Sequence, residues 1–173
     1  MKRRGIDRPS AEELASIEVT DEDERDYVRH MNDVARALQR ARIPGTIDWC
    51  AVCIGWVAQV YAVKGMGLDF WLGFIETCNE VWQDQKVEGV PAFDGMPKGT
   101  DIYPRMMRLK GALERAKLDP VGDDACFALV SLCAKQFARV GVPPTVFHEL
   151  GRMAFLDAEK RIADMAQKKG GKA

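Results

Sequence analysis

Cys50 and Cys53 form a Cys-x-x-Cys pair, a spacing that serves either thiol–disulfide exchange or metal binding. Redox chemistry requires a reactive thiolate at a helix start beside a β-sheet, and no strand pattern precedes this pair. A metal site requires about four ligands, but the chain has only two histidines and no second close pair of cysteines. Residues three apart share a helix face, so another helix would have to supply further ligands. We therefore expect Cys50 and Cys53 to fill space in the core, with metal binding as their fallback role and no cofactor.

Glu76 and Glu80 lie four residues apart, which places both carboxylates on one face of a helix. Paired carboxylates can bind a divalent ion or act in acid–base catalysis, so a helical metal- or nucleotide-dependent enzyme is one hypothesis. The chain lacks the Glu-x-x-Glu followed by Glu-x-x-Asp of all-α nucleotide pyrophosphohydrolases, and an amphipathic helix normally turns such acids to solvent. We assign no catalytic residue and favour a protein that is not an enzyme.

Residues 134–153 resemble a helix-turn-helix, with a glycine-containing turn between two segments of helical apolar spacing. That motif places its second helix in the major groove of DNA, so a transcription regulator is another hypothesis. Glu149 falls where the motif has an apolar residue, and Pro143-Pro144 stiffens the turn. With a net charge of -1 at pH 7, the chain lacks the basic surface typical of nucleic-acid binding.

These residues must be positioned by helices, because apolar residues recur at steps of three and four almost throughout the chain. The segment Trp49–Val63 contains no charged residue, and Gln59 is its only strongly polar side chain. A helix that is apolar on every side is buried, and this one is too short to cross a membrane. No segment shows the alternation of a half-buried strand. The sequence predicts an all-α compact bundle of six to seven helices around a central apolar helix at about residues 46–64.

Caps and helix breakers locate the other elements of a single domain that spans residues 1–173. The expected helices lie at about 10–19, 21–41, 69–82, 101–116, 123–140 and 145–167. Asp69 and Thr145 have the side chains of N-cap residues. The last helix is expected to bury Met153 and Met165 with the rest of its apolar stripe.

Three segments are expected to lie outside the helices. Residues 1–9 and 168–173 are basic and are expected to be short disordered termini. Three glycines and two prolines make residues 87–100 a long loop. Within it, the string Asp94–Thr100 resembles a loop of some phage late-gene regulators, which fits a phage or bacterial source.

The cysteine count and the N-terminus point to a compartment. The five cysteines are an odd number with apolar neighbours, and no apolar run follows the basic N-terminus. Free thiols and the lack of a secretory signal pattern predict a soluble protein of the reducing cytoplasm.

Aromatic residues concentrate between residues 70 and 82, and aromatic side chains dominate the energetics of protein interfaces. We expect a small adaptor, regulator or assembly factor that binds a protein partner or forms a homo-oligomer, with nucleic acid as the alternative partner and no membrane. The candidate binding residues are Trp71, Phe74 and Trp82 in this helix and Phe93 and Lys98 in the loop.

Overall fold

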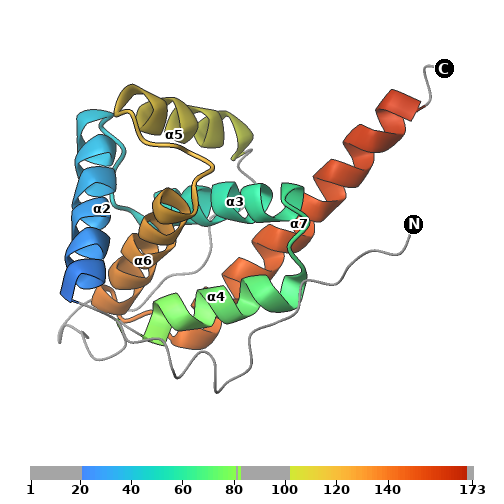
Figure 1. The fold of residues 1–173 in the computed structure, drawn as a ribbon. Helices are drawn as coiled ribbons and strands as arrows, with labels where there is room; N and C mark the ends of the chain where they lie inside the picture. Colours follow the sequence, from blue (N-terminus) through green and yellow to red (C-terminus); the bar gives the residue numbers. More distant parts are fainter. Residues whose placement is uncertain (1–20, 81, 83–101, 171–173) are drawn as a thin grey trace.

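A computed structural model of the protein describes residues 21–80, 82 and 102–170. They form the helices α2 (Asp21–Arg40), α3 (Ile47–Val63), α4 (Leu68–Glu80), α5 (Tyr103–Arg115), α6 (Asp123–Arg139) and α7 (Pro144–Gly170) (Figure 1). No strand occurs within these ranges, and the packed helices confirm the all-α bundle. The helix expected at 10–19 and the loop expected at 87–100, with Phe93 and Lys98, lie outside the described residues.

Helix α3 lies at the centre of the bundle and packs against α5, α6 and α7 (Figure 1). Its side chains are buried on every face, and Val52, Ile54 and Val57 have no exposed surface at all. The absence of charge along this segment explains its position, because no face of the helix requires contact with water. The prediction of a central apolar helix is therefore confirmed.

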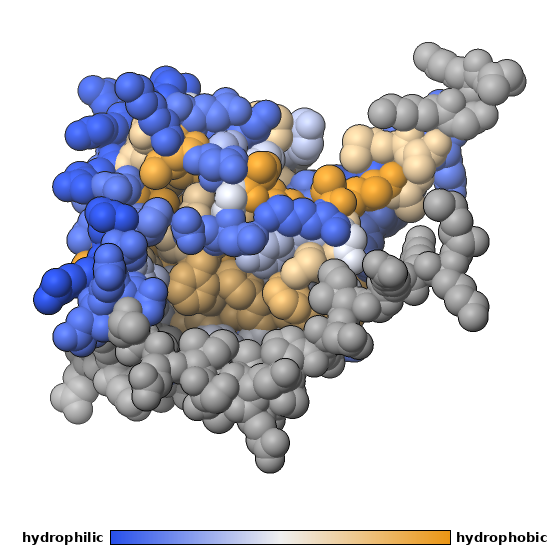
Figure 2. All heavy atoms as spheres, viewed as in Figure 1, coloured by the Kyte–Doolittle hydropathy of each residue, from blue (hydrophilic) through white to orange (hydrophobic). Residues whose placement is uncertain are grey.

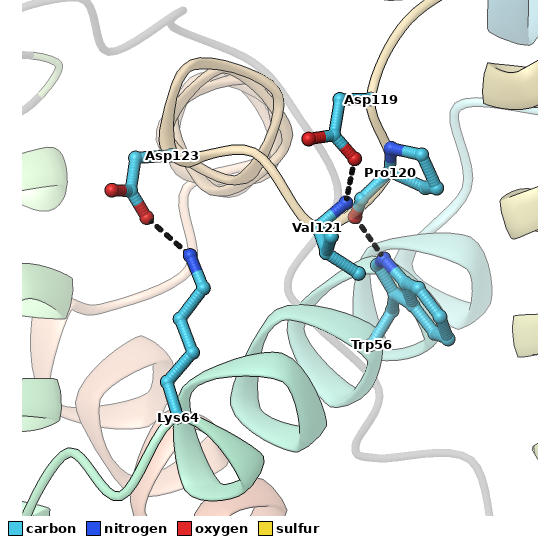
Figure 3. A network of polar contacts seen from close by, with 6 residues as sticks. All are labelled: Trp56, Lys64, Asp119, Pro120, Val121 and Asp123. Carbon is cyan, nitrogen blue, oxygen red and sulfur yellow. Dashed lines mark hydrogen bonds and ion pairs between the residues drawn. The ribbon is translucent and has the colours of Figure 1, made fainter.

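The second half of α3 is fixed to the turn that precedes α6 (Figure 3). Trp56 Nε1 donates a hydrogen bond of 2.8 Å to the carbonyl of Pro120, which satisfies a buried indole donor. Lys64 Nζ forms an ion pair of 2.7 Å with Asp123 Oδ1 at the start of α6. Asp119 Oδ1 accepts the amide of Val121 at 3.1 Å and so shapes the turn itself. The hydrogen bond orients Trp56, and the ion pair joins the end of α3 to the start of α6.

Two helices begin one residue before their predicted N-cap residue. Helix α4 begins at Leu68, so Asp69 lies inside the first turn, where its charge still favours the helix dipole but is not the N-cap. Helix α7 begins at Pro144, whose fixed φ suits the first helical position, so Thr145 is not the N-cap either. Helix α7 also extends to Gly170, and residues 168–170 are therefore helical where a disordered tail was expected.

Helices α4 and α7 approach each other closely at Gly151, which lies in the first half of α7. Trp71 Nε1 on α4 donates a hydrogen bond of 2.7 Å to the carbonyl of Gly151. A Cβ atom at this position would lie 2.9 Å from Cγ1 of Ile75, closer than carbon atoms pack. The lack of a side chain at Gly151 therefore sets the distance between the two helices.

We predict that Gly151→Ala lowers the free energy of unfolding by about 1–3 kcal/mol, because the new methyl group overpacks the contact with Ile75. The higher helix propensity of Ala offsets at most about 1 kcal/mol of this loss. Gly73→Ala on α4 is the matched control, since nothing lies within 4 Å of its Cβ position. The control variant should be as stable as the wild type or more so in urea denaturation. Equal stability of the two variants would contradict close packing at Gly151.

Candidate functional site

The second half of α7 extends beyond the helical bundle (Figure 1). From its start to just past its middle, α7 buries a stripe of apolar side chains that includes Phe147, Phe155 and Ala158. Helical periodicity carries this stripe on through Ile162 and Met165. Ile162 is half-buried, and Met165 is 52% exposed. The core-facing side of α7 thus continues past the end of the core.

A groove of about 350 Å³ lies between this end of α7 and helices α3 and α5. We call it the α5–α7 groove. Its first wall is mainly apolar and consists of Trp56 and Gln59 from α3 and Tyr103, Met106 and Met107 from α5. Its second wall is one flank of α7, formed by Arg161, Asp164, Met165 and Lys168. Figure 2 shows hydrophobic colours along the projecting end of α7, next to the hydrophilic colour of its outer side.

Three apolar side chains of the groove, Tyr103, Met107 and Met165, are open to solvent. Tyr103 is 51% exposed and Met107 37% exposed, although the apolar spacing of α5 places them near its buried face. Met153, which does not line the groove, is also exposed, so the expectation that Met153 and Met165 are buried is wrong. Exposed apolar side chains that gather along a groove are typical of an interaction surface.

Arg161 places unsatisfied hydrogen-bond donors in the groove. Its Nη2 atom lies 2.8 Å from Asp157 Oδ2, close enough for an ion pair. Neither Nη2 nor Nε has an acceptor in hydrogen-bond geometry among the described residues, and both atoms are buried. The Nη2 and Oδ2 atoms are close enough to attract each other as charges, but the angle at the N–H group does not suit a hydrogen bond. Buried donors normally have a partner, and the side chain of Arg161 is 25% exposed, so its guanidinium group has donors left for an acceptor in the groove.

The aromatic residues proposed from the sequence have different positions. Trp71 has no exposed surface and belongs to the core, so its assignment as a binding residue is wrong. Phe74 and Trp82 are half-buried, and the exposed aromatic residue of α4 is instead Phe70, at 45%. Lys135 Nζ lies 4.7 Å from the centre of the Trp82 ring, in a cation–π contact. A role of Phe74 or Trp82 in binding stays a prediction.

Cys50 and Cys53 lie in the core, as predicted, and face Cys133 of α6. The thiol of Cys133 lies 3.6 Å from the carbonyl oxygen of Cys50. Hydrogen bonds with the thiols of Cys50 and Cys53, together with burial, raise the pKa of Cys133 well above its ordinary value. The thiol therefore stays protonated and unreactive. Within the described ranges, no group of three His, Cys, Asp or Glu side chains is arranged to hold a metal ion.

The two alternative sites gain no support from the arrangement of the helices. Glu76 and Glu80 are exposed on α4, as expected for the solvated face of an amphipathic helix. The first half of α7 would be the recognition helix of a helix-turn-helix. It is packed against α3 and α4, with Phe147 and Gly151 buried. The outer face of this half is exposed, so DNA binding by residues 134–153 stays a prediction.

No protein-family model matches the sequence, and comparisons with curated proteins and with solved structures give no match. None of the helices within the described ranges is long and apolar enough to span a membrane. The α5–α7 groove combines exposed apolar side chains, charges of both signs and an unsatisfied buried donor, and we take it as the candidate site.

Proposed function

We propose that the protein acts by binding an amphipathic helix of a protein partner in the α5–α7 groove. The observation that carries this proposal is the apolar stripe of α7, which continues to Met165 after the bundle ends. Burying exposed apolar surface drives most protein association, at about 25 cal/mol per Å². A cytoplasmic adaptor, regulator or assembly factor is the class of protein that this surface fits.

The form of the groove supports a helical ligand. One wall exposes Tyr103 and Met107, and a methionine side chain adapts to the shape of an apolar ligand. The other wall carries Arg161, Asp164 and Lys168, which can pair with charges at the rim of a bound helix. An amphipathic helix presents such a combination, with apolar anchors every three or four residues between charged flanks.

The test uses two equally exposed methionines of α7, of which only Met165 lines the groove. Met165 lies in the groove at 52% exposure, and Met153 lies outside it at 53%. A photo-crosslinking amino acid is placed at either position in cells that express the protein. A protein captured from position 165 but not from 153 is then purified and titrated calorimetrically against the chain.

We predict that Met165→Glu weakens this binding at least about tenfold, because a buried carboxylate replaces an apolar contact. Met153→Glu should leave the affinity within about twofold of the wild type, since a rim or surface charge contributes little. Circular dichroism and urea denaturation check that both variants are folded. Equal effects of the two substitutions, or equal capture at the two positions, would rule out the groove as the binding surface.

A further inference from the structure

We infer that the helix bound in the α5–α7 groove is the end of α7 from a second copy of the chain, in antiparallel orientation. This inference rests on the proposed function, because it names the partner of the same groove. Each copy would place its projecting helix end in the groove of the other, as a two-fold axis requires.

The charges on the groove-facing flank of α7 are arranged for such a pair. Asp157, Arg161, Asp164 and Lys168 follow one another at steps of four, three and four residues, which places them along one flank of the helix. Their signs alternate. In an antiparallel pair centred between residues 162 and 163, Asp157 faces the second copy's Lys168, and Arg161 faces its Asp164. Every one of these contacts then joins opposite charges, and the symmetry repeats each of them.

A parallel pair has the opposite electrostatics. The same four positions would then face their own copies, so Arg161 would meet Arg161 and Asp164 would meet Asp164. Like charges at facing positions of paired helices are unfavourable, and this difference sets the orientation.

Arg161 provides an independent reason for the same register. Its Nε atom is buried without an acceptor among the described residues, in the wall of the groove. The antiparallel pair brings the carboxylate of the second copy's Asp164 to this position. Arginine and carboxylate groups form strong charge-assisted hydrogen bonds, and the exposed 25% of the Arg161 side chain is the part that this carboxylate would contact. Met165 of each copy would become covered by the apolar wall of the other groove.

The inference is tested by sedimentation velocity of the full chain over a range of concentrations. We expect the wild type to form a dimer whose Kd rises with salt, because the pairing charges are partly exposed. The variant Asp164→Arg carries a positive charge at both position 161 and position 164. The variant Arg161→Asp carries a negative charge at both positions. Each variant should raise the dimer Kd by about a hundredfold, since like charges now face each other.

Mixing the two variants restores complementary charges at both positions. We therefore expect an equimolar mixture of Asp164→Arg and Arg161→Asp to dimerise again, although neither variant does so alone. Lys160→Glu, an exposed charge change that lies outside the groove, is the control and should leave the Kd unchanged. Urea denaturation of each variant separates loss of pairing from loss of folding.

A wild-type chain that stays monomeric at every concentration would overturn the inference, as would a mixture that fails to dimerise. The crosslinks from position 165 then separate it from the proposed function. Capture of a different protein at position 165, confirmed by titration, would retain the groove as a binding surface without a second copy. A monomeric chain with no crosslink at that position would contradict both.

Discussion

Trp71→Ala is expected to lower the free energy of unfolding by about 3–5 kcal/mol, as large aromatic truncations in a core do. Trp71 has no exposed surface, and its ring centre lies 5.8 Å from those of Tyr61 and Phe74 and 6.1 Å from that of Phe155. These rings come from α3, α4 and α7, so the substitution leaves a cavity where three helices meet. It also removes the hydrogen bond of 2.7 Å to the carbonyl of Gly151.

Two further variants separate these contributions. Trp71→Phe keeps an aromatic ring and removes the indole donor, so it should cost less than Trp71→Ala, by the difference in cavity size. Phe70→Ala, one residue away, truncates a ring that is 45% exposed and should cost less than about 1 kcal/mol. Urea denaturation followed by circular dichroism measures all three. A similar loss for Trp71→Ala and Phe70→Ala would show that Trp71 is not central to the core.

The helices could be predicted from the sequence because their signals are local. The charge-free segment Trp49–Val63 has one stable environment, the interior, and the structure places it there. Trp71 lies on the buried stripe of α4 with Ile75 and Cys78, which recur at helical spacing. The assignment of the same side chain to a binding surface was wrong because a fully buried ring cannot contact a partner. The large size of Trp71 indicates that it matters for packing, but size alone does not show that a residue binds a partner.

The candidate site could not be predicted in the same way, because exposure depends on where neighbouring helices end. The apolar spacing of α7 is the same at Phe155 and at Met165, yet only the first has a helix to cover it. Tyr103 is exposed for a similar reason, at the first residue of α5. One signal was present in the sequence: Gln59, the lone strongly polar side chain of the segment Trp49–Val63, lies in the wall of the groove.

The same core should make the protein sensitive to alkaline pH. Burial raises the pKa of Cys78 from 9.0 to about 12, although a hydrogen bond from Ser131 lowers it. Burial likewise raises the pKa of Cys126 to about 12, with the charge of Lys64 lowering it and those of Asp123 and Asp119 raising it. Both thiols stay protonated in the folded protein at pH values where the unfolded chain has lost these protons.

The sign of the effect follows from the proton count. Above about pH 9 the unfolded state binds fewer protons than the folded state. The free energy of unfolding therefore decreases as pH rises. The protein keeps its full stability with respect to these two thiols below about pH 9, and it loses stability progressively as pH approaches 12. Each thiol removes on the order of 1 kcal/mol per pH unit, so the two thiols together remove several kcal/mol between about pH 9 and pH 12. A total stability of about 5–15 kcal/mol makes unfolding within this interval the expected result.

Urea denaturation under reducing conditions, repeated from neutral pH to about pH 10, measures this slope before most tyrosines ionise. Cys78→Ala removes one titrating group. It should reduce the slope by roughly 1 kcal/mol per pH unit, even though it costs about 1 kcal/mol of stability at neutral pH. A cysteine that only fills space changes the stability at all pH values equally, whereas a thiol kept protonated by burial changes its pH dependence. A stability that is constant up to pH 10 would show that water reaches these thiols and that the interior between α3, α4 and α6 is less closed than their burial indicates.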